Sequence, residues 1–402
     1  MFKREITMLF ARFLMPLMKK GTLIIINYDG KVYNIGNGNN PKVIVKFHDA
    51  SLGTKLFINP ALYAGEAYMD GKLTLEEGTL FDMLDLVMSN IGKVHGHWAA
   101  RSLKFVERFS GLLRTYNPIS RAAKNVAHHY DLSSVMYEKF LDSDMQYSMA
   151  YYKDNNDSLP IAQINKIDHI AKKLCLEPGM KILDVGCGWG GLALALNKKY
   201  GVDVTGISLS KEQLKIANQR AEEEGITKSV KFLFKDYRNV KEKFDRIVSV
   251  GMFEHVGLPK YKTFFRCMRD CLKDDGVFLL HTIGRADGPG ATDSWTLKYI
   301  FPGGYAPGLS EIIPFAEKEN LYITDVEVLR LHYAYTLRDW RKNFLHNYEE
   351  IKEIYDERFC RMWEFFLASA ESSFRNAWHV NFHIQMSPNL QTVPLTRDYM
   401  YK

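Results

Sequence analysis

Cysteine is scarce in this chain of 402 residues, which contains five: Cys175, Cys187, Cys267, Cys271 and Cys360. Their number is odd, and their spacing matches neither a set of zinc ligands nor a disulfide framework. Only Cys267 and Cys271 lie close together in the sequence. We therefore predict reduced, mostly buried thiols, a cytoplasmic protein and no metal site.

Long apolar runs are missing as well, since no segment approaches the roughly 20 residues of a membrane span. The first 21 residues superficially resemble a secretory signal, but Arg12 and Pro16 interrupt the apolar stretch and two lysines replace the cleavage site. The sequence thus predicts a soluble or peripheral protein. The first helix has one apolar face, formed by Phe2, Met8, Leu9, Phe13 and Leu17. We expect this face to pack on its own domain, and the alternative is that it lies on lipid.

Acidic residues are nearly missing from residues 93–124, where only Glu107 opposes the basic side chains. These are Lys93, Arg101, Lys104, Arg108, Arg114, Arg121 and Lys124. Such a segment suits an anionic surface, and a solvated helical face explains it equally well. No nucleic-acid-reading motif accompanies the segment, so we expect no nucleic-acid partner.

Hydrophobic residues make up 46% of the chain, enough for two packed cores. Residues 21–80 carry mainly β signals, and residues 81–125 read as helical and basic. From residue 161 helices and strands alternate, which predicts an α/β parallel sheet with helices on both faces. We predict an N-terminal α+β domain (1–90), a basic helical connector (91–125) and a catalytic domain (126–402).

A glycine-rich turn, ILDVGCGWGG at 182–191, follows the first buried strand of that sheet. Gly186, Gly188 and Gly190 let the backbone approach a ligand closely before a helix begins. In parallel sheets ligands lie beyond the carboxyl ends of the strands. Those ends hold Asp184, Ser208, Asp236, Glu254 and His281. The second strand lacks the acid of a plain dinucleotide fingerprint, which excludes that ligand class.

This order of elements resembles the class I S-adenosylmethionine-dependent methyltransferases, with a Rossmann-like sheet. Seven sequence blocks narrow the resemblance to the cyclopropane-fatty-acyl-phospholipid synthases and the related mycolic acid cyclopropane synthases. The blocks are NVAHHYDLS (125–133), QYSMAYY (146–152), ILDVGCGWGG, IVSVGMFEHVG (247–257), GVFLLHTIG (276–284), KYIFPGG (298–304) and LHYAYTL (331–337). The first domain resembles the lipid-binding N-terminal part of the longer bacterial synthases.

The resemblance implies S-adenosylmethionine as cofactor, with Asp184 marking its methionine end and Asp236 and Tyr237 suited to its adenine. The expected cofactor residues are Tyr147, Ser148, Asp184, Gly186, Gly188, Gly190, Ser208, Leu209, Ser210, Gln213, Asp236 and Tyr237.

The resemblance also implies a bound bicarbonate as general base for ring closure. Its expected contacts are Glu254, His281, Tyr333, the amide of Ile283 and the position of Met149. In this scheme His281 and Tyr333 donate to the anion, and Glu254 accepts its hydroxyl proton. Relatives usually carry cysteine at Met149, which a thioether can replace if the contact runs through the main-chain amide.

The expected activity is transfer of a methylene group to a cis double bond in phospholipid acyl chains, giving a cyclopropane ring. The expected partners are an anionic, unsaturated phospholipid bilayer and a second copy in a homodimer, with the protein peripheral on the inner membrane surface. Three alternatives stay open: a lipid methyltransferase giving a methyl-branched product, a lipid-binding protein that has lost activity, and a methyltransferase of small amines.

Overall fold

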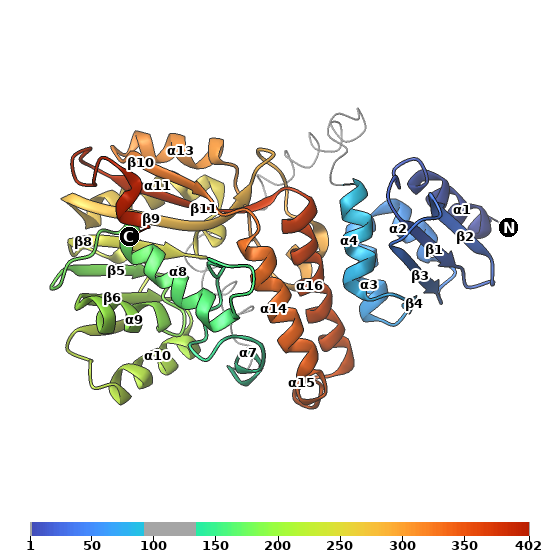
Figure 1. Ribbon diagram of the computed structural model, residues 1–402, viewed down its shortest axis with the longest axis horizontal. Coiled ribbons are helices and arrows are strands. Elements are labelled where there is room, and N and C mark those ends of the chain that lie inside the picture. Colours follow the sequence, from blue (N-terminus) through green and yellow to red (C-terminus); the bar gives the residue numbers. More distant parts are fainter. Residues whose placement is uncertain (1, 92–133, 402) are drawn as a thin grey trace. The chain divides into compact units, whose positions relative to one another are not determined.

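The computed structural model describes residues 2–91 and 134–401, with side-chain burial given from residue 7 onward (Figure 1). Contacts divide the chain into two compact units. The first comprises Met1–Val106, Thr292–Pro302 and Leu337–Trp378, and the second comprises Glu107–Ala291, Gly303–Thr336 and His379–Lys402. The basic segment 93–124, the predicted boundary near residue 125 and the block 125–133 lie outside the described residues.

A four-stranded sheet of order β2-β1-β3-β4 forms the centre of the first unit. Its strands are β1 (Thr22–Ile26), β2 (Val32–Gly36), β3 (Lys42–Phe47) and β4 (Leu73–Glu77). The helices of this region are α1 (Phe2–Leu14), α2 (Leu52–Ile58), α3 (Pro60–Met69) and α4 (Leu80–Ile91). The predicted small α+β unit is confirmed, and so is the helical start of residues 81–91.

The prediction of β structure in residues 21–80 was wrong for residues 65–69, which belong to helix α3. The helix begins with Asn59, whose side chain accepts the N–H of Leu62 at 3.1 Å, followed by Pro60 in the first turn. A capping asparagine and an N-terminal proline both favour helix initiation. Glycine at Gly65 is needed for packing, since a Cβ there would lie 2.3 Å from Nε1 of Trp295.

Segments from far along the chain complete the first unit: α12 (Ser294–Tyr299), α15 (Tyr348–Ile354) and α16 (Glu357–Asn376). Trp295 is buried, and its Nε1 donates to Sδ of Met69 at 3.3 Å. The Tyr68 hydroxyl donates to Glu364 at 2.6 Å. The sequence placed these later segments in the predicted catalytic domain, whereas their contacts group them with the N-terminal elements.

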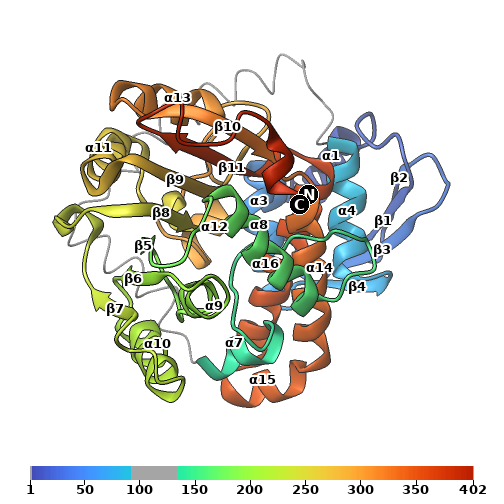
Figure 2. The same ribbon diagram turned by 60° about the vertical axis from the view of Figure 1, so that its left-hand side comes forward.

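The second unit contains a seven-stranded sheet of order β10-β11-β9-β8-β5-β6-β7 (Figures 1 and 2). The strands are β5 (Lys181–Val185), β6 (Asp203–Ser208), β7 (Val230–Phe234), β8 (Phe244–Val250), β9 (Leu272–Arg285), β10 (Tyr322–Val328) and β11 (His379–Ser387). Strands β5 to β9 are parallel, which confirms the predicted α/β architecture. The chain order reverses at β5, so a ligand is expected beyond its carboxyl end.

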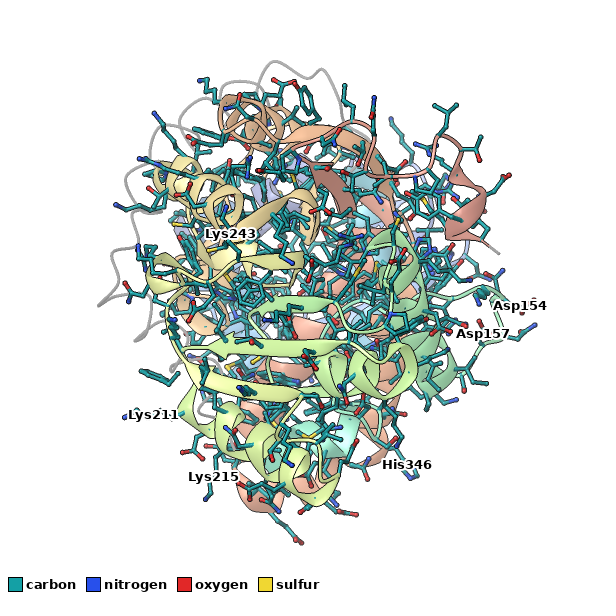
Figure 3. The ribbon with its side chains drawn as sticks, turned by 90° about the vertical axis from the view of Figure 1, so that its left-hand side faces the viewer. Asp154, Asp157, Lys211, Lys215, Lys243 and His346 are labelled. Atoms are coloured by element: carbon teal, nitrogen blue, oxygen red, sulfur yellow. The ribbon has the colours of Figure 1, made fainter. Side chains whose placement is uncertain are left out.

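Helices cover both faces of this sheet (Figure 2). They are α8 (Leu159–Lys173), α9 (Gly191–Tyr200), α10 (Lys211–Glu223), α11 (Tyr261–Cys271) and α13 (Leu309–Lys318). The second unit also contains α7 (Ser134–Phe140) and the first turn of α14 (His332–His346), whose later residues belong to the first unit. One buried cluster joins α11 and α13 to the sheet, and a second joins α8, α9 and α10 to it. Charged side chains such as Lys211 and Lys215 project outward from α10 (Figure 3).

The sequence analysis predicted neither β10 nor β11. Strand β11 pairs antiparallel with β9, and β10 pairs antiparallel with β11.

All five cysteines are free thiols, and three of them are buried, as the sequence predicted. Within residues 2–91 and 134–401, no helix is long and apolar enough to cross a bilayer.

Candidate functional site

The glycine turn after β5 builds the floor of the candidate site. Gly186, Gly188 and Gly190 all have positive φ, at 92°, 54° and 85°. A Cβ on Gly186 would lie 2.7 Å from Cβ of Met252, and one on Gly190 would lie 2.6 Å from Cζ of Phe232. Larger residues would therefore be strained in backbone and in packing at both positions. The turn brings the main chain close to a cavity and then starts helix α9.

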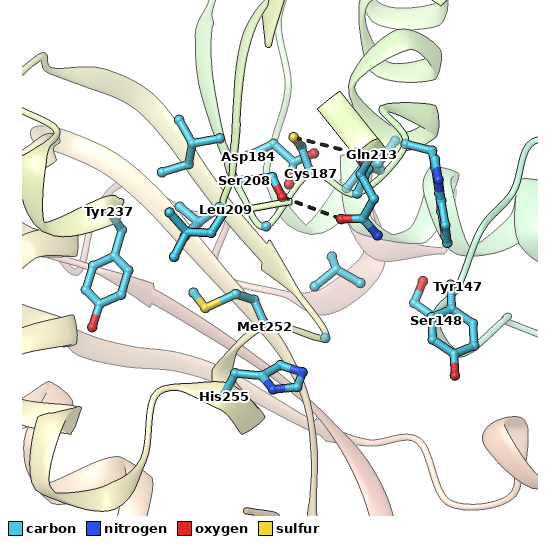
Figure 4. A pocket seen from close by; sticks show the side chains of 18 of the residues that line it. Tyr147, Ser148, Asp184, Cys187, Ser208, Leu209, Gln213, Tyr237, Met252 and His255 are labelled. Atoms are coloured by element: carbon cyan, nitrogen blue, oxygen red, sulfur yellow. Dashed lines mark hydrogen bonds between the residues drawn. The ribbon is translucent and has the colours of Figure 1, made fainter. Parts of the chain in front are cut away.

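A cavity of about 150 Å³ opens beside this turn, at the carboxyl ends of the parallel strands (Figure 4). Ten of the twelve predicted cofactor residues line it: Tyr147, Ser148, Asp184, Gly186, Gly188, Ser208, Leu209, Gln213, Asp236 and Tyr237. Gly190 and Ser210 do not line it. Gly190 packs against Phe232, and the Ser210 hydroxyl caps α10 by accepting the N–H of Gln213 at 3.3 Å.

Several lining residues were not found from the sequence, among them Trp189, Arg238, Met252 and His255. Met252 and His255 flank Glu254 in the block 247–257, so their position after the fourth parallel strand was a usable signal. Burial lowers the pKa of His255 to about 4, so its imidazole is neutral at pH 7. The wall on this side therefore carries little positive charge.

Asp184 is the buried carboxylate of the cavity. Its Oδ2 has no hydrogen-bond partner among the described residues. Burial raises the pKa of Asp184 to about 7, and the charge of Lys166 opposes this rise. Lys166 on α8 is itself buried, and its Nζ donates to Oε1 of Gln146 at 2.6 Å and to Oγ of Ser148 at 2.9 Å. An incoming cationic or hydroxyl group would satisfy the unpartnered oxygen.

The residues that follow β6 and β7 support the predicted cofactor contacts unequally. The Ser208 hydroxyl lies 3.5 Å from Oε1 of Gln213, and both side chains face the cavity (Figure 4). The Asp236 carboxylate is held by Arg238, which donates from Nε and Nη2 at 2.7 Å each. The Tyr237 ring packs edge-on against Phe264, with centroids 5.3 Å apart. Tyr237 thus contributes to the core, and its stacking on adenine stays a prediction.

Glu254 lies in the short helix η2 (Phe253–His255), directly after β8. Its Oε1 accepts the backbone N–H of Ile283 at 2.6 Å, and its backbone carbonyl accepts the N–H of Tyr305 at 2.9 Å. Oε2 is buried and has no partner in the described parts of the chain. Burial raises the pKa of Glu254 to about 7, although its own backbone N–H, the Ile283 amide and the Thr282 hydroxyl oppose the rise. A carboxyl group that titrates near neutral pH suits proton transfer.

The imidazole of His281 is held by strand β11. Nδ2 of Asn381 donates to its Nε2 at 2.7 Å, and Nε2 of His383 lies 2.8 Å from its Nδ1. Both ring nitrogens are thus engaged by residues that the sequence did not single out. The Ile283 amide, predicted to contact an anion, donates to Glu254 instead. The structure therefore brings Glu254 and Ile283 together and bonds His281 of β9 to two residues of β11. None of these three predicted catalytic residues lines the cavity.

The other two predicted catalytic residues lie on different elements of the second unit. Met149 is fully buried, next to Ala150, whose N–H donates to Oγ1 of Thr336 at 2.9 Å. Tyr333 is half-buried in the first turn of α14. The neighbouring His332 accepts the N–H of Tyr152 at 3.0 Å and joins this turn to the block 146–152.

The chain is similar to known proteins in sequence and in fold. Residues 118–384 match the family described as mycolic acid cyclopropane synthetase, and residues 13–95 match a domain of unknown function, DUF7884. The chain is 39% identical over 329 residues to the cyclopropane-fatty-acyl-phospholipid synthase of Escherichia coli (strain K12), covering 80% of this chain and 83% of that protein. It is 34% identical over 390 residues to a probable fatty acid methyltransferase of Pseudomonas putida, covering 93% and 95%.

The solved structure of the mycolic acid cyclopropane synthase CmaA1, complexed with SAH and CTAB, resembles the chain in fold. It has 33% sequence identity and a TM-score of 0.63, and the match covers 67% of this chain and 99% of that one.

Proposed function

This chain belongs to the mycolic acid cyclopropane synthetase family, and we propose that it transfers a methylene group from S-adenosylmethionine to a cis double bond in phospholipid acyl chains. It is an S-adenosylmethionine-dependent methyltransferase, with a class I fold. The product of the proposed reaction is a cyclopropane ring. The E. coli relative is named for this reaction and this class of lipid.

The cavity at the glycine turn fits the cofactor. Asp184 offers a buried oxygen without a partner in the described chain, and the main chain of Gly186 and Gly188 lines the cavity. Ser208 and Gln213 offer hydroxyl and amide groups on the same wall. When bound, the cofactor supplies an electrophilic methyl group on a sulfonium sulfur. These residues would bind it and orient that methyl group toward the acyl chain.

The observation that carries the proposal is the buried carboxylate of Glu254, between two residues of the cavity wall, Met252 and His255. Methylation of an alkene leaves a carbocation, and ring closure requires a base that removes a proton from the added methyl group. Oε2 of Glu254 is a buried acceptor at this position. The C–H electron pair closes the ring, and the proton goes to the base.

Bicarbonate as that base fits the residues only in part. Oε2 of Glu254 could accept its hydroxyl proton, but the Ile283 amide and both nitrogens of His281 already have partners. We therefore derive ring closure from Glu254 itself. Thorough removal of dissolved bicarbonate decides between the two bases: slower product formation supports the anion, and an unchanged rate supports the carboxylate alone.

An exposed apolar patch on the first unit suits a lipid surface. Phe13 of α1 is 58% exposed and Ile58 of α2 is 72% exposed, and the Phe13 and Phe57 rings lie 6.3 Å apart, edge to face. The buried face of α1 is formed by Phe10 and Leu14, so the helix packs on its own unit and still presents apolar side chains outward. Exposed basic residues flank the patch at Arg12, Lys19 and Lys20. Apolar insertion next to positive charge favours an anionic bilayer.

The test uses purified protein, S-adenosylmethionine carrying a trideuterated methyl group, and vesicles of monounsaturated phospholipid. Mass spectrometry of the released fatty acids gives the result. A ring retains two deuterium atoms from the donated methyl group, and this product supports the proposal. Absence of any labelled fatty acid, with the cofactor bound, contradicts it and supports a lipid-binding protein without activity.

A second candidate is a methyl-branched unsaturated product, in which the carbocation loses a proton from a neighbouring chain carbon and all three deuterium atoms are retained. One observation favours it: the P. putida relative is named a probable fatty acid methyltransferase. The resemblance also implies a cysteine at the position of Met149. Methylation of small amines is the third candidate, and labelled amines in place of labelled lipids would support it.

We also propose that the protein is a homodimer. Light scattering of the purified protein without vesicles tests this.

A further inference from the structure

Residues 144–148, between α7 and α8, form one wall of the cofactor cavity, and we call them the wall loop. Four of the loop residues line the cavity: Met145, Gln146, Tyr147 and Ser148. Tyr147 and Ser148 lie across the cavity from Tyr237 (Figure 4). The wall loop belongs to no helix or strand, so its position against the glycine turn depends on the side chains that hold it.

Arg220 of helix α10 holds the first residue of the wall loop. Its Nη2 donates to the Asp144 carboxylate, and its Nη1 donates to the Asp144 carbonyl at 3.3 Å and to the Trp189 carbonyl at 3.0 Å. Trp189 belongs to the glycine turn and lines the cavity, whereas Arg220 does not line it. The several N–H donors of a planar guanidinium allow one side chain to serve three acceptors. Arg220 therefore binds the loop and the turn together.

Gln146 extends this network along the wall loop. Its Nε2 donates to Oδ2 of Asp144 at 2.9 Å, and its Oε1 accepts from Nζ of Lys166 at 2.6 Å. The same ammonium group donates to Oγ of Ser148 at 2.9 Å. One end of the loop is thus connected to α10 and the other end to α8, through a continuous set of side-chain hydrogen bonds.

The wall loop also packs directly on the start of α9. A Cβ on Gly191, the first residue of that helix, would lie 2.7 Å from the Asp144 carbonyl oxygen and 2.5 Å from Nε2 of Gln146. Both distances are too short for a carbon contact, so a larger residue would push the loop away from the turn. The wall loop therefore requires the second glycine of the pair at 190–191.

Met145, inside the wall loop, has a left-handed backbone conformation with φ at 54°. Residues other than glycine rarely adopt this conformation, because Cβ lies too close to the following carbonyl oxygen. They keep it where the surrounding structure holds them in place. The side chains of Asp144 and Gln146, on either side of Met145, are both bound in the network and supply this restraint.

We propose that Arg220 is a positioning residue for the cofactor, because it holds the wall loop against the glycine turn before the cofactor binds. The inference rests on the part of the proposed function that places S-adenosylmethionine in this cavity. A wall that is already ordered loses little conformational entropy on binding, which raises affinity. Arg220 acts through Asp144 and Trp189, so it affects cofactor binding and leaves the chemical step unchanged.

Arg220→Met tests this role by calorimetry with S-adenosylhomocysteine. We expect Kd to rise about 10-fold with a less favourable entropy of binding, because the loop is then ordered at the expense of binding. KM for S-adenosylmethionine should rise by a similar factor, and kcat at saturating cofactor should stay at the wild-type value. An unchanged Kd, or a lower kcat at saturating cofactor, would overturn the proposal.

Arg220→Lys is the conservative variant, and it serves if Arg220→Met does not fold. It keeps the positive charge, but an ammonium group lacks the planar fork that reaches three acceptors. Its Kd should therefore lie between those of the wild type and Arg220→Met. A Kd equal to that of the wild type would mean that charge alone matters, which contradicts the positioning role.

Arg269→Met is the matched control. Arg269 of α11 also donates to one carboxylate, that of Asp274 at 2.9 Å, and to one main-chain carbonyl, that of Leu272 at 3.3 Å. Its side chain is 27% exposed, compared with 22% for Arg220, and neither of its partners lines the cavity. The control should keep the wild-type Kd. Equal weakening in both variants would overturn the specific role of Arg220.

Hydrogen exchange measures the loop itself and needs no turnover. In free Arg220→Met, the amides of residues 144–148 should exchange faster than in the wild type, and bound S-adenosylhomocysteine should restore slow exchange. Faster exchange throughout the second unit would show that Arg220 only stabilises the fold, and this would contradict the proposal.

Gly191→Ala displaces the same loop by a second route. Its Kd should also rise, and the double variant Arg220→Met/Gly191→Ala should bind more tightly than the product of the two single effects predicts, because one loop is displaced only once. Effects that multiply would contradict a shared action on the wall loop.

Asp184→Asn separates this inference from the proposed function, because it changes the cavity without touching the Arg220 contacts. Weak binding by Asp184→Asn with wild-type binding by Arg220→Met would contradict the positioning role and leave the cofactor in this cavity. Wild-type binding by both variants would contradict the placement of the cofactor as well. Weak binding by both supports the positioning role and the cofactor site together.

Discussion

The carboxylate of Glu254 accepts the backbone N–H of Ile283 at 2.6 Å, across the carboxyl ends of two neighbouring parallel strands. This bond fixes one carboxylate oxygen and leaves Oε2 buried without a partner in the described residues, while its sequence neighbours Met252 and His255 line the cofactor cavity. The side chain is thus held rigidly while one oxygen stays available for a proton. Such positioning is what a general base in a dry site requires.

Replacing Glu254 by glutamine should lower kcat by about 10² or more, because an amide cannot take up the proton. Affinity for S-adenosylmethionine, measured by calorimetry, should stay close to that of the wild type, since the hydrogen bond from Ile283 can be kept. Glu212→Gln, an exposed carboxylate on α10, is the control and should be fully active. Loss of cofactor binding in Glu254→Gln would show that Glu254 has a different role.

The rate should also depend on pH through Glu254, whose pKa is raised to about 7. The ionised carboxylate is the acceptor, so kcat should fall as pH drops below about 7, and this limb should be missing in Glu254→Gln. The effect on stability has the opposite sign: between the usual pKa and 7 the folded state binds more protons, so the free energy of unfolding falls as pH rises. A pH series of kcat and of urea unfolding measures both, and a flat wild-type kcat profile contradicts the assignment.

Lys166 should control the charge of Asp184. Lys166→Met removes the positive charge that opposes the rise in the Asp184 pKa, so Asp184 becomes protonated at pH 7 and binds the cofactor less well. Calorimetry between pH 6.5 and 8.5 should show affinity that is weaker and recovers as pH rises. Lys199→Met breaks the half-exposed pair with Asp168 on the same helical layer and should leave affinity unchanged. Unaltered affinity in Lys166→Met would contradict this role.

Gly65→Ala should destabilise the first unit by about 1–3 kcal/mol, because the new Cβ would overlap the buried ring of Trp295. Thermal unfolding measures the loss. The double variant Gly65→Ala/Trp295→Phe should lose less than the sum of the single variants, since the smaller ring makes room for the methyl group. Additive losses would mean that the two residues do not compete for the same space.

Vesicle binding should depend on the apolar patch of α1 and α2. Phe13→Ser/Ile58→Ser should weaken co-sedimentation with anionic vesicles, because two large exposed apolar side chains are lost from the contact. Leu395→Ser removes an even more exposed apolar residue from the other unit and should have no effect. Activity on a short-chain soluble substrate should be kept in all three proteins. Equal binding by the patch variant and the wild type would exclude this surface.

The sequence was most informative where a local pattern carries the structure. The glycine turn, the alternation from residue 161 to 284 and ten residues of the cavity wall follow from short motifs, from periodicity and from the family resemblance, and the structure has them in place. Gly190 and Ser210 do not line the cavity, and a glycine that packs on Phe232 or a serine that caps a helix has the same local sequence as a ligand contact. Only their surroundings distinguish these roles.

The sequence by itself determined the family, the parallel part of the sheet and the cofactor turn, because each of these depends on motifs or periodicity in residues that are close together in the chain. Tertiary structure alone decided what surrounds Glu254 and His281. Asn381 and His383 lie about 100 residues from His281 and meet it only through the register of β11 on β9, for which no local signal exists. The pairing of β10 with β11 places Glu327 opposite His383, so the surroundings of His281 follow from strand pairing.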